Sequence, residues 1–254
     1  MYTDTHTHLY DEQFQADENE MIQRAIDTGV MKMYMPNCDS TTIEPMLRIT
    51  DKWPSNCFPM MGLHPCYVKE NYKAELDIVI QSLSQRKFYA IGEIGLDYYW
   101  DLSFKEQQIE AFGTQIGLAL QYGLPIVIHS RESIEDCIDI VRKNQDGKLS
   151  GIFHCFSGTL GQAKKIIETG LYLGIGGVVT YKKSSLADII KEVPLSNIVL
   201  ETDAPYLAPV PYRGKRNESS YIPIIAAKIA EIKGIAIEEV ASITRQNAEK
   251  IFCN

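Results

Sequence analysis

The sequence lacks the features that mark membrane, secreted and disordered proteins. No apolar run approaches the roughly 20 residues that a membrane-spanning helix needs, and the longest runs are interrupted by glycine, as in residues 171–179. The chain opens on MYTDTHTHL, which has neither the basic nor the apolar region of a signal peptide. Low-complexity tracts and blocks of like charge are also missing. We therefore expect a globular monomer without membrane attachment.

Paired cysteines and excess basic charge are missing too. None of the six cysteines forms a C-x-x-C pair, and a chain of 254 residues can bury a core without disulfides. We interpret them as reduced thiols, which predicts a cytoplasmic protein. The formal net charge of −8 argues against a protein that binds nucleic acid over its whole surface. It still permits a local cationic site, because bound divalent cations concentrate positive charge at one place.

Helix-like segments recur along the chain, and glycine often follows their last turn. Glycine supplies the left-handed residue that closes a helix. The glycines in such places are Gly29, Gly123, Gly170 and Gly234. A short apolar run follows the first three, whereas the fourth leads into a C-terminal helical segment. Capping boxes predict helix starts at Ser103 with Glu106 and at Thr159 with Gln162.

Apolar strand candidates alternate with these helical segments. They lie near residues 2–6, 31–36, 58–63, 88–93, 125–129, 151–154, 171–175 and 197–202. Alternating strands and helices predict an α/β fold with a parallel sheet, and this many units in roughly 250 residues favour a (β/α)8 TIM barrel. A doubly wound open sheet would show the same alternation. We see no linker and expect residues 1–254 to form one domain.

Histidine is rare, and its copies stand where the predicted strands end. The five histidines are His6, His8, His64, His129 and His154. The carboxyl ends of barrel strands converge on one mouth, where the active site is built. Because alternate strand residues point the same way, His6 and His8 can bind one cation. Packed core histidines are the alternative, but several at equivalent places favour metal ligands.

Carboxylates stand at the ends of two other predicted strands. Glu93 follows the buried run 89–92, where a charge is costly unless it is paired or bound to metal; its two oxygens can bridge two cations. Asp203 can bind one metal and take a proton from an attacking water. Glu201 would either orient a ligand imidazole or be a solvated acid at the rim. Nitrogen and carboxylate ligands suit Zn²⁺, Mn²⁺ or Mg²⁺; strand parity makes Cys155 a packed thiol.

Short motifs at the strand ends carry a resemblance to a known family. They are DTHTHL at 4–9, GLHP at 62–65, IGEIGLDYY at 91–99, IHSR at 128–131, HCFSG at 154–158 and ETDAPYL at 201–207, with RGKRNE at 213–218. In this order they resemble the TatD family of metal-dependent deoxyribonucleases, within the amidohydrolase-like barrels. The resemblance spans nearly the whole chain. Cys66 stands where members of the family often carry another histidine.

The resemblance implies a site with two divalent cations and a nucleic-acid substrate. One cation would be held by His6, His8, Glu93 and Asp203. The other would be held by Glu93, His129 and His154, with Glu93 shared. The implied reaction is hydrolysis of DNA phosphodiester bonds, often from the 3′ end of single strands.

Substrate phosphates need cationic or donor groups beside the metals. His64 and Arg131 are at strand ends and could hold phosphate oxygens, Arg131 through two parallel hydrogen bonds. Arg213 and Lys215 lie in the last loop, and such loops often form the phosphate site of these barrels. A solvated basic loop is the alternative. The aromatic run 98–100 could stack on an unpaired base or cap the barrel rim.

These observations predict an enzyme, a metal-dependent phosphodiesterase that acts on single-stranded DNA as a 3′–5′ exonuclease. The alternative is an amidohydrolase that cleaves a C–N or ester bond in a small metabolite. Many amidohydrolase barrels bridge their metals with a carboxylated lysine, whereas Glu93 takes that place here. A binding protein with a relict site is the third class, and the complete set of ligand residues argues against it.

Overall fold

The computed structural model describes residues 1–252, so Cys253 lies outside the described residues. The strands are β1 (Tyr2–Asp4), β2 (Val30–Met35), β3 (Cys57–Pro59), β4 (Ile91–Asp97), β5 (Ile126–Arg131), β6 (Gly151–Phe153), β7 (Tyr172–Ile175) and β8 (Ile198–Leu200). The α-helices are α1 (Glu18–Asp27), α2 (Ile43–Lys52), α3 (Tyr72–Gln85), α4 (Lys105–Tyr122), α5 (Ile134–Asn144), α6 (Leu160–Glu168), α7 (Leu186–Glu192), α8 (Ile222–Lys233) and α9 (Ile237–Phe252). Short 3-10 turns are η1 (Glu12–Phe14), η2 (Pro65–Tyr67), η3 (Gly177–Thr180), η4 (Leu195–Asn197) and η5 (Ser219–Tyr221).

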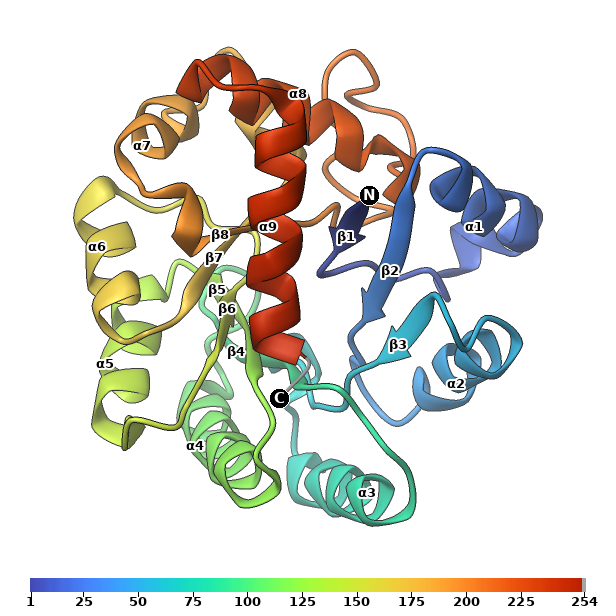
Figure 1. Cartoon of the computed structure of the whole chain (residues 1–254). Coiled ribbons are helices and arrows are strands. Elements are labelled where there is room, and N and C mark those ends of the chain that lie inside the picture. The colour runs from blue at the N-terminus through green and yellow to red at the C-terminus, as the bar shows by residue number, and fades with distance from the viewer. Residues whose placement is uncertain (253–254) are drawn as a thin grey trace.

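The strands pair in parallel around a common axis. They form one group in the order β1-β2-β3 and another in the order β4-β5-β6-β7-β8. Single parallel bridges connect the groups at both seams, Thr7 with Ala204 and Met61 with Ile91. Figure 1 shows helices α1 to α8 in a ring around the strands. The expected (β/α)8 barrel is confirmed, and the carboxyl ends of its strands share one face.

Two sequence expectations about strands and helix starts are wrong. The fourth strand, expected near 88–93, spans Ile91–Asp97, because its polar end still pairs with β5 as far as Asp97 with Arg131. The capping box at Ser103 does not form: α4 begins at Lys105, and the Ser103 amide instead donates to the Asp101 carboxylate at 2.8 Å. Such an Asx turn competes with a helix cap. The other capping box, at Thr159, is confirmed.

The glycines expected after helices all adopt positive φ. The angles are 89° at Gly29, 65° at Gly123, 83° at Gly170 and 66° at Gly234. The last of them is followed by the C-terminal helix α9, as expected.

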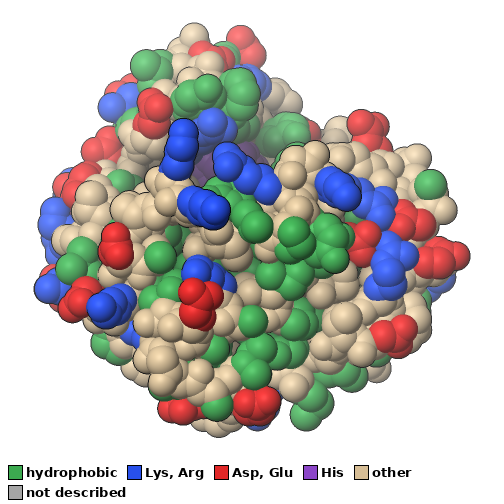
Figure 2. All heavy atoms as spheres, turned by 90° about the horizontal axis from the view of Figure 1, so that it is seen from above, with side chains coloured by type: hydrophobic (Ala, Val, Ile, Leu, Met, Phe, Trp, Pro, Cys, Tyr) green, Lys and Arg blue, Asp and Glu red, His purple; other side chains and the backbone are tan. Residues whose placement is uncertain are grey.

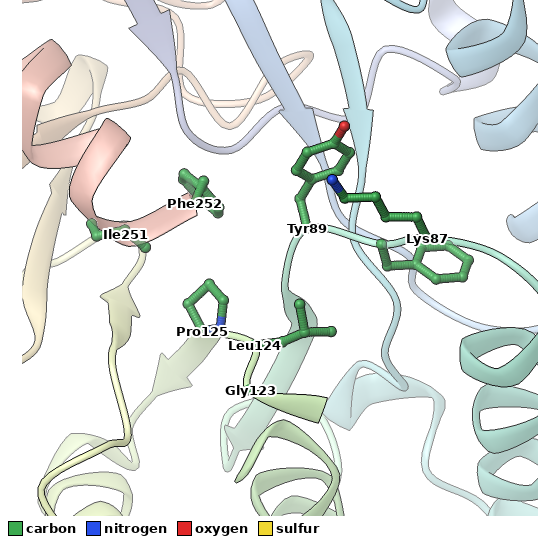
Figure 3. Close-up of a pocket in the computed structure, with 8 residues that line it drawn as sticks. Lys87, Tyr89, Gly123, Leu124, Pro125, Ile251 and Phe252 are labelled. Atoms are coloured by element: carbon green, nitrogen blue, oxygen red, sulfur yellow. The ribbon is translucent and has the colours of Figure 1, made fainter. Parts of the chain in front are cut away.

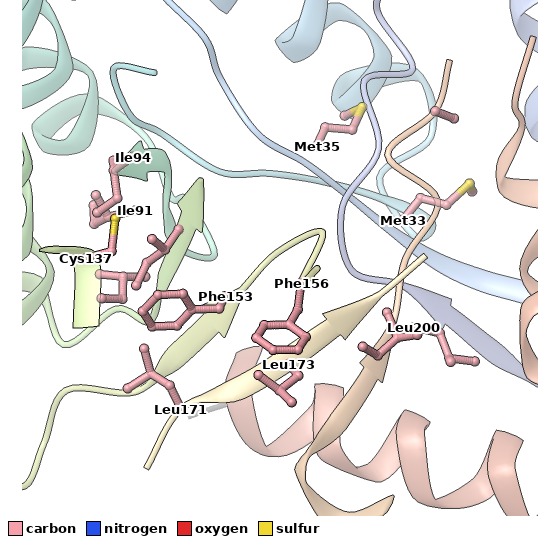
Figure 4. Close-up of a cluster of buried hydrophobic side chains, with 14 of the residues drawn as sticks. Met33, Met35, Ile91, Ile94, Cys137, Phe153, Phe156, Leu171, Leu173 and Leu200 are labelled. Atoms are coloured by element: carbon pink, nitrogen blue, oxygen red, sulfur yellow. The ribbon is translucent and has the colours of Figure 1, made fainter. Parts of the chain in front are cut away.

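The core has two parts. The larger cluster includes side chains of strands and surrounding helices, among them Phe153, Leu173 and Cys137 (Figure 4). The smaller cluster lies inside the barrel and includes the end of α9, where the rings of Tyr34 and Phe252 stack with centroids 3.8 Å apart. Helix α9 thus packs against the amino end of the barrel.

A pocket of about 280 Å³ lies at the amino ends of β4 and β5. Figure 3 shows Tyr89, Pro125 and Phe252 around it. Its lining is largely apolar, so it offers no constellation for hydrolysis. Within residues 1–252 no helix has the length and apolarity required to cross a membrane. The cysteines of this part of the chain are free thiols.

Candidate metal centre

Close contact between β4 and β5 positions the central carboxylate. Glu93 lies in β4 and is 2% exposed. A side chain at Gly92 would collide with Val127 of β5, and one at Gly95 would overlap the carbonyl of His129. Gly95 also has a φ of 134°, which favours glycine. The glycines that flank Glu93 therefore let the two strands approach and set Glu93 beside His129.

One oxygen of Glu93 faces three imidazoles. Its Oε1 atom lies 2.9 Å from Nε2 of His154, 3.0 Å from Nδ1 of His129 and 3.3 Å from Nε2 of His64. These histidines come from β5 and from the segments after β3 and β6. Strands far apart in sequence thus deliver their side chains to the same oxygen.

The other oxygen faces the histidines that follow β1. Glu93 Oε2 is 3.1 Å from Nε2 of His6 and 3.6 Å from Nε2 of His8. Asp203 Oδ1 lies 3.6 Å and 3.5 Å from the same two nitrogens. Asp203 follows β8 with a φ of 56°, a rare conformation for this residue. All five histidines of the chain thus lie within 3.6 Å of Glu93.

For His8 and His129, a hydrogen bond on the far side of the neutral ring fixes which nitrogen faces the centre with a lone pair. The Tyr10 hydroxyl donates to the carbonyl of Pro36 and therefore accepts from His8 Nδ1 at 2.9 Å. Asp97 Oδ2 accepts from His129 Nε2 at 2.8 Å. Because the proton is on the outer nitrogen, the inner nitrogen of both rings is free to bind a cation.

His64 has the opposite tautomer. Its Nδ1 accepts the backbone N–H of Cys66 at 3.1 Å, so a neutral ring carries its proton on Nε2. That nitrogen points at Glu93 and at His129 Nδ1, 3.3 Å away. His64 is therefore a hydrogen-bond donor at the edge of the centre, not a metal ligand, in this arrangement.

Two buried acids stand behind the imidazoles. Glu201, fully buried, places Oε1 3.6 Å from His154 Nδ1, which is longer than a hydrogen bond. Asp97, 1% exposed, was missed by the sequence reasoning, although it lies in the GLDYY motif. Burial would raise the pKa of Asp97, but the hydrogen bond and the electrostatic interaction with His129 outweigh burial and lower this pKa to about 2.

The histidines also hold the central acids in their ionised form. Burial alone would raise the pKa of Glu93, but electrostatic interactions with the surrounding imidazoles of His154, His64 and His6 hold it well below its usual value. Burial likewise opposes ionisation of Asp203, whereas its hydrogen bond with His8 and the nearby imidazoles lower its pKa. Both side chains are therefore carboxylates at neutral pH.

The donor atoms fit divalent cations. Three groups have ligand atoms within 4.8 Å of one another: His6, His8 and Asp203; His6, Glu93 and His154; His64, Glu93 and His129. Neutral imidazole and carboxylate are the ligands that Zn²⁺ takes at bond lengths of about 2.0–2.2 Å. The Nε2 atoms of His6 and His8 lie 3.3 Å apart, close enough for both nitrogens to bind one cation.

The centre opens into a cleft of about 1050 Å³. His64 and Arg131 line this cleft, whereas Arg213 and Lys215 are exposed outside its lining, with the Arg213 guanidinium 4.5 Å from the ring centroid of Tyr181. Cys155 also lines it, so the expectation of a packed thiol is wrong. Strand β6 ends at Phe153 and Cys155 has a φ of 46°, so strand alternation no longer applies there.

A (β/α)8 barrel with imidazoles and carboxylates gathered at the carboxyl ends of its strands defines a metal-dependent hydrolase. The family model described as TatD related DNase matches residues 3–253. The chain belongs to this family, as its motifs indicate.

Individual relatives of the chain support the same family membership. The metal-dependent hydrolase YabD of Bacillus subtilis is 38% identical over 253 residues, which cover 99% of each chain. The 3′-5′ ssDNA/RNA exonuclease TatD of Erwinia tasmaniensis is 30% identical over 256 residues, 98% of each chain. The crystal structure of the TatD homologue YjjV from Escherichia coli K12 superposes with a TM-score of 0.94 at 29% identity, covering 100% of this chain and 98% of that one.

Proposed function

We propose that this protein hydrolyses phosphodiester bonds in single-stranded nucleic acid with two divalent cations, and that single-stranded DNA degraded from its 3′ end is the preferred substrate. The main support is the convergence of imidazoles on both oxygens of one buried carboxylate, Glu93, with His8 and His129 oriented by hydrogen bonds from behind. Relatives named as exonucleases for single-stranded DNA and RNA support the choice of substrate.

The ligand atoms form two groups that share Glu93. We assign one cation to His6, His8, Glu93 and Asp203, and the other to Glu93, His129 and His154. Asp97 orients His129 through a hydrogen bond, and we assign to Glu201, 3.6 Å behind His154, the corresponding role once a cation binds that ring. Bound cations at these places would lower the pKa of an attacking water and offset charge that develops on the phosphate. Zn²⁺, Mn²⁺ and Mg²⁺ are the candidates.

We assign the movement of the proton to Asp203. Its side chain is 15% exposed, more than the 3% of the Glu93 side chain, so it is the central carboxylate that water in the cleft reaches more readily. Since its lowered pKa keeps it ionised at neutral pH, it can accept the proton of the attacking water.

The remaining groups bind the phosphates. His64 lines the cleft and can contact a phosphate oxygen beside the centre, and Arg131 can donate to one from the end of β5. Figure 2 shows Lys and Arg side chains gathered around a hollow in which histidine is visible. We assign Arg213 and Lys215, in the exposed last loop, to attraction of the strand at longer range. This local charge resolves the conflict with a net charge of −8.

A cleavage panel tests the proposal. Purified protein is first freed of metal with a chelator and then supplied with Zn²⁺, Mn²⁺ or Mg²⁺. Single-stranded DNA, single-stranded RNA and duplex DNA, each labelled at the 5′ end, are the substrates. We expect a mononucleotide ladder from single-stranded DNA that depends on metal. Protein that leaves every oligonucleotide intact but hydrolyses a small amide or ester would instead be an amidohydrolase.

A further inference from the structure

Apolar side chains are exposed at the mouth of the cleft. Trp100 is 68% exposed, Tyr206 50% and Leu207 40%, and all three line the cleft that contains the metal centre. Trp100 follows β4, whereas Tyr206 and Leu207 follow β8. Large apolar side chains held in water next to a catalytic centre are typical of a ligand-binding surface.

Two kinds of contact hold the segment that carries Trp100: hydrogen bonds to its backbone and a guanidinium next to its ring. Its backbone N–H and that of Tyr99 donate to Asp97 Oδ1 at 3.2 Å and 3.0 Å, and the other oxygen of Asp97 binds His129. The guanidinium of Arg131 lies 3.7 Å from the ring centroid of Tyr99 and 5.1 Å from that of Trp100. One carboxylate thus connects the backbone that carries the indole to a residue of the metal centre.

The opposite wall is also held in place. The Tyr206 hydroxyl donates to Asp11 at 3.1 Å, and its ring centroid is 6.2 Å from that of His8. Leu207 has a φ of 56°, an unfavourable conformation for a residue with a side chain. A side chain at Gly177 would overlap the Leu207 carbonyl, so glycine there permits this conformation. The protein therefore retains backbone strain where it presents an apolar side chain to the cleft.

We propose that Trp100 stacks on one unpaired base of the nucleotide next to the scissile phosphate, while Arg131 binds that nucleotide's phosphate. Tyr206 and Leu207 contact the strand from the other wall. The inference rests on the proposed function and adds the group that selects single strands. A base in a duplex is already stacked and paired on both sides, so it has no free face for the indole.

Replacement of Trp100 tests the stacking. For Trp100→Ala we expect KM for single-stranded DNA to rise roughly 5- to 150-fold, the range that loss of one base–aromatic stack gives. Turnover of methyl 4-nitrophenyl phosphate, which has no nucleobase, should stay unchanged. Trp100→Phe should restore most of the loss. Tyr122→Ala is the matched control, because Tyr122 is an aromatic residue, 37% exposed, at the far end of α4.

Substrates with a single abasic site identify the base. Wild-type protein should lose affinity when one particular base is removed, and Trp100→Ala should show no further loss on that abasic strand. An unchanged KM in Trp100→Ala, or losses that simply multiply, would overturn the stacking.

Binding to metal-free protein separates the two proposals. We expect single-stranded DNA to quench the fluorescence of wild-type protein, and the quench to disappear in Trp100→Phe, which leaves Trp53 as the other tryptophan. Quenching without cleavage in any metal would refute the nuclease and leave the stacking surface. Cleavage with an unchanged KM in Trp100→Ala would support the nuclease and refute the stacking. Absence of both cleavage and quenching would refute both proposals.

Discussion

Asp97→Asn should weaken metal binding although Asp97 is not assigned as a ligand. Asp97 accepts hydrogen bonds on both oxygens, from His129 on Oδ2 and from the amides of Tyr99 and Trp100 on Oδ1. Asparagine has one acceptor oxygen. Whichever way its amide is turned, an NH₂ group faces another donor.

The size of the effect follows from the bond that is lost. A hydrogen bond to a charged partner contributes about 1.5–3 kcal/mol net. Loss of the acid behind a metal-binding histidine typically costs about 10- to 100-fold in metal affinity or activity. With the amide turned toward His129, the ring's tautomer is no longer fixed, so we expect metal affinity to fall by that factor. The cation assigned to His129 should be lost first.

Competition with a chelating dye measures the affinity for each cation. Circular dichroism monitors folding. Asp101→Asn is the matched control: Asp101 lies in the same loop and accepts the Ser103 amide at 2.8 Å, but it pairs with Lys69. Equal metal affinity in Asp97→Asn, Asp101→Asn and wild type would refute the role of Asp97.

Three further predictions concern the proton acceptor, the basic loop and an ion-pair network. Asp203→Asn should fold normally and lose about 10²- to 10⁴-fold in kcat; turnover equal to wild type would remove Asp203 from the mechanism. Arg213→Ala combined with Lys215→Ala should raise KM for oligonucleotides and flatten its salt dependence, and a KM that responds to salt as in wild type would leave the loop without a role. Arg216 lowers the pKa of Asp17 through hydrogen bonds at 2.7 Å. The stabilisation that this ion pair gives the folded protein is therefore present above the ordinary carboxyl pKa of about 4, and it is lost as the pH falls through the lower pKa of Asp17 in the folded protein. Arg216→Met should therefore lower Tm at neutral pH and lose less Tm on acidification than wild type does; parallel Tm curves would contradict this.

The sequence predicted the centre well because strand ends in a parallel barrel meet at one face. His6, His8, Glu93, His129 and Asp203 were expected there on that ground, and the structure brings them together. This rule depends on the order of the strands and not on their exact limits. Glu93 was therefore predicted correctly although the fourth strand was expected to start three residues and to end four residues too early.

Features that depend on turns could not be predicted in the same way. Asp97 was missed because the fourth strand was expected to end near Glu93, whereas it pairs as far as Asp97. The tautomer of His64 follows from the 3-10 turn after it, where the Cys66 amide turns back toward the ring. Cys155 faces the cleft because a positive φ ends the alternation. Hydrophobic period carries no information on these local conformations.

Anomalous diffraction from crystals loaded with Mn²⁺ or Zn²⁺ is the most direct measurement of the centre itself. We predict two peaks about 3.5–4 Å apart, on either side of the Glu93 carboxylate, one towards His8 and Asp203 and the other towards His129 and His154. A single peak, or peaks that Glu93 does not touch, would contradict the shared carboxylate.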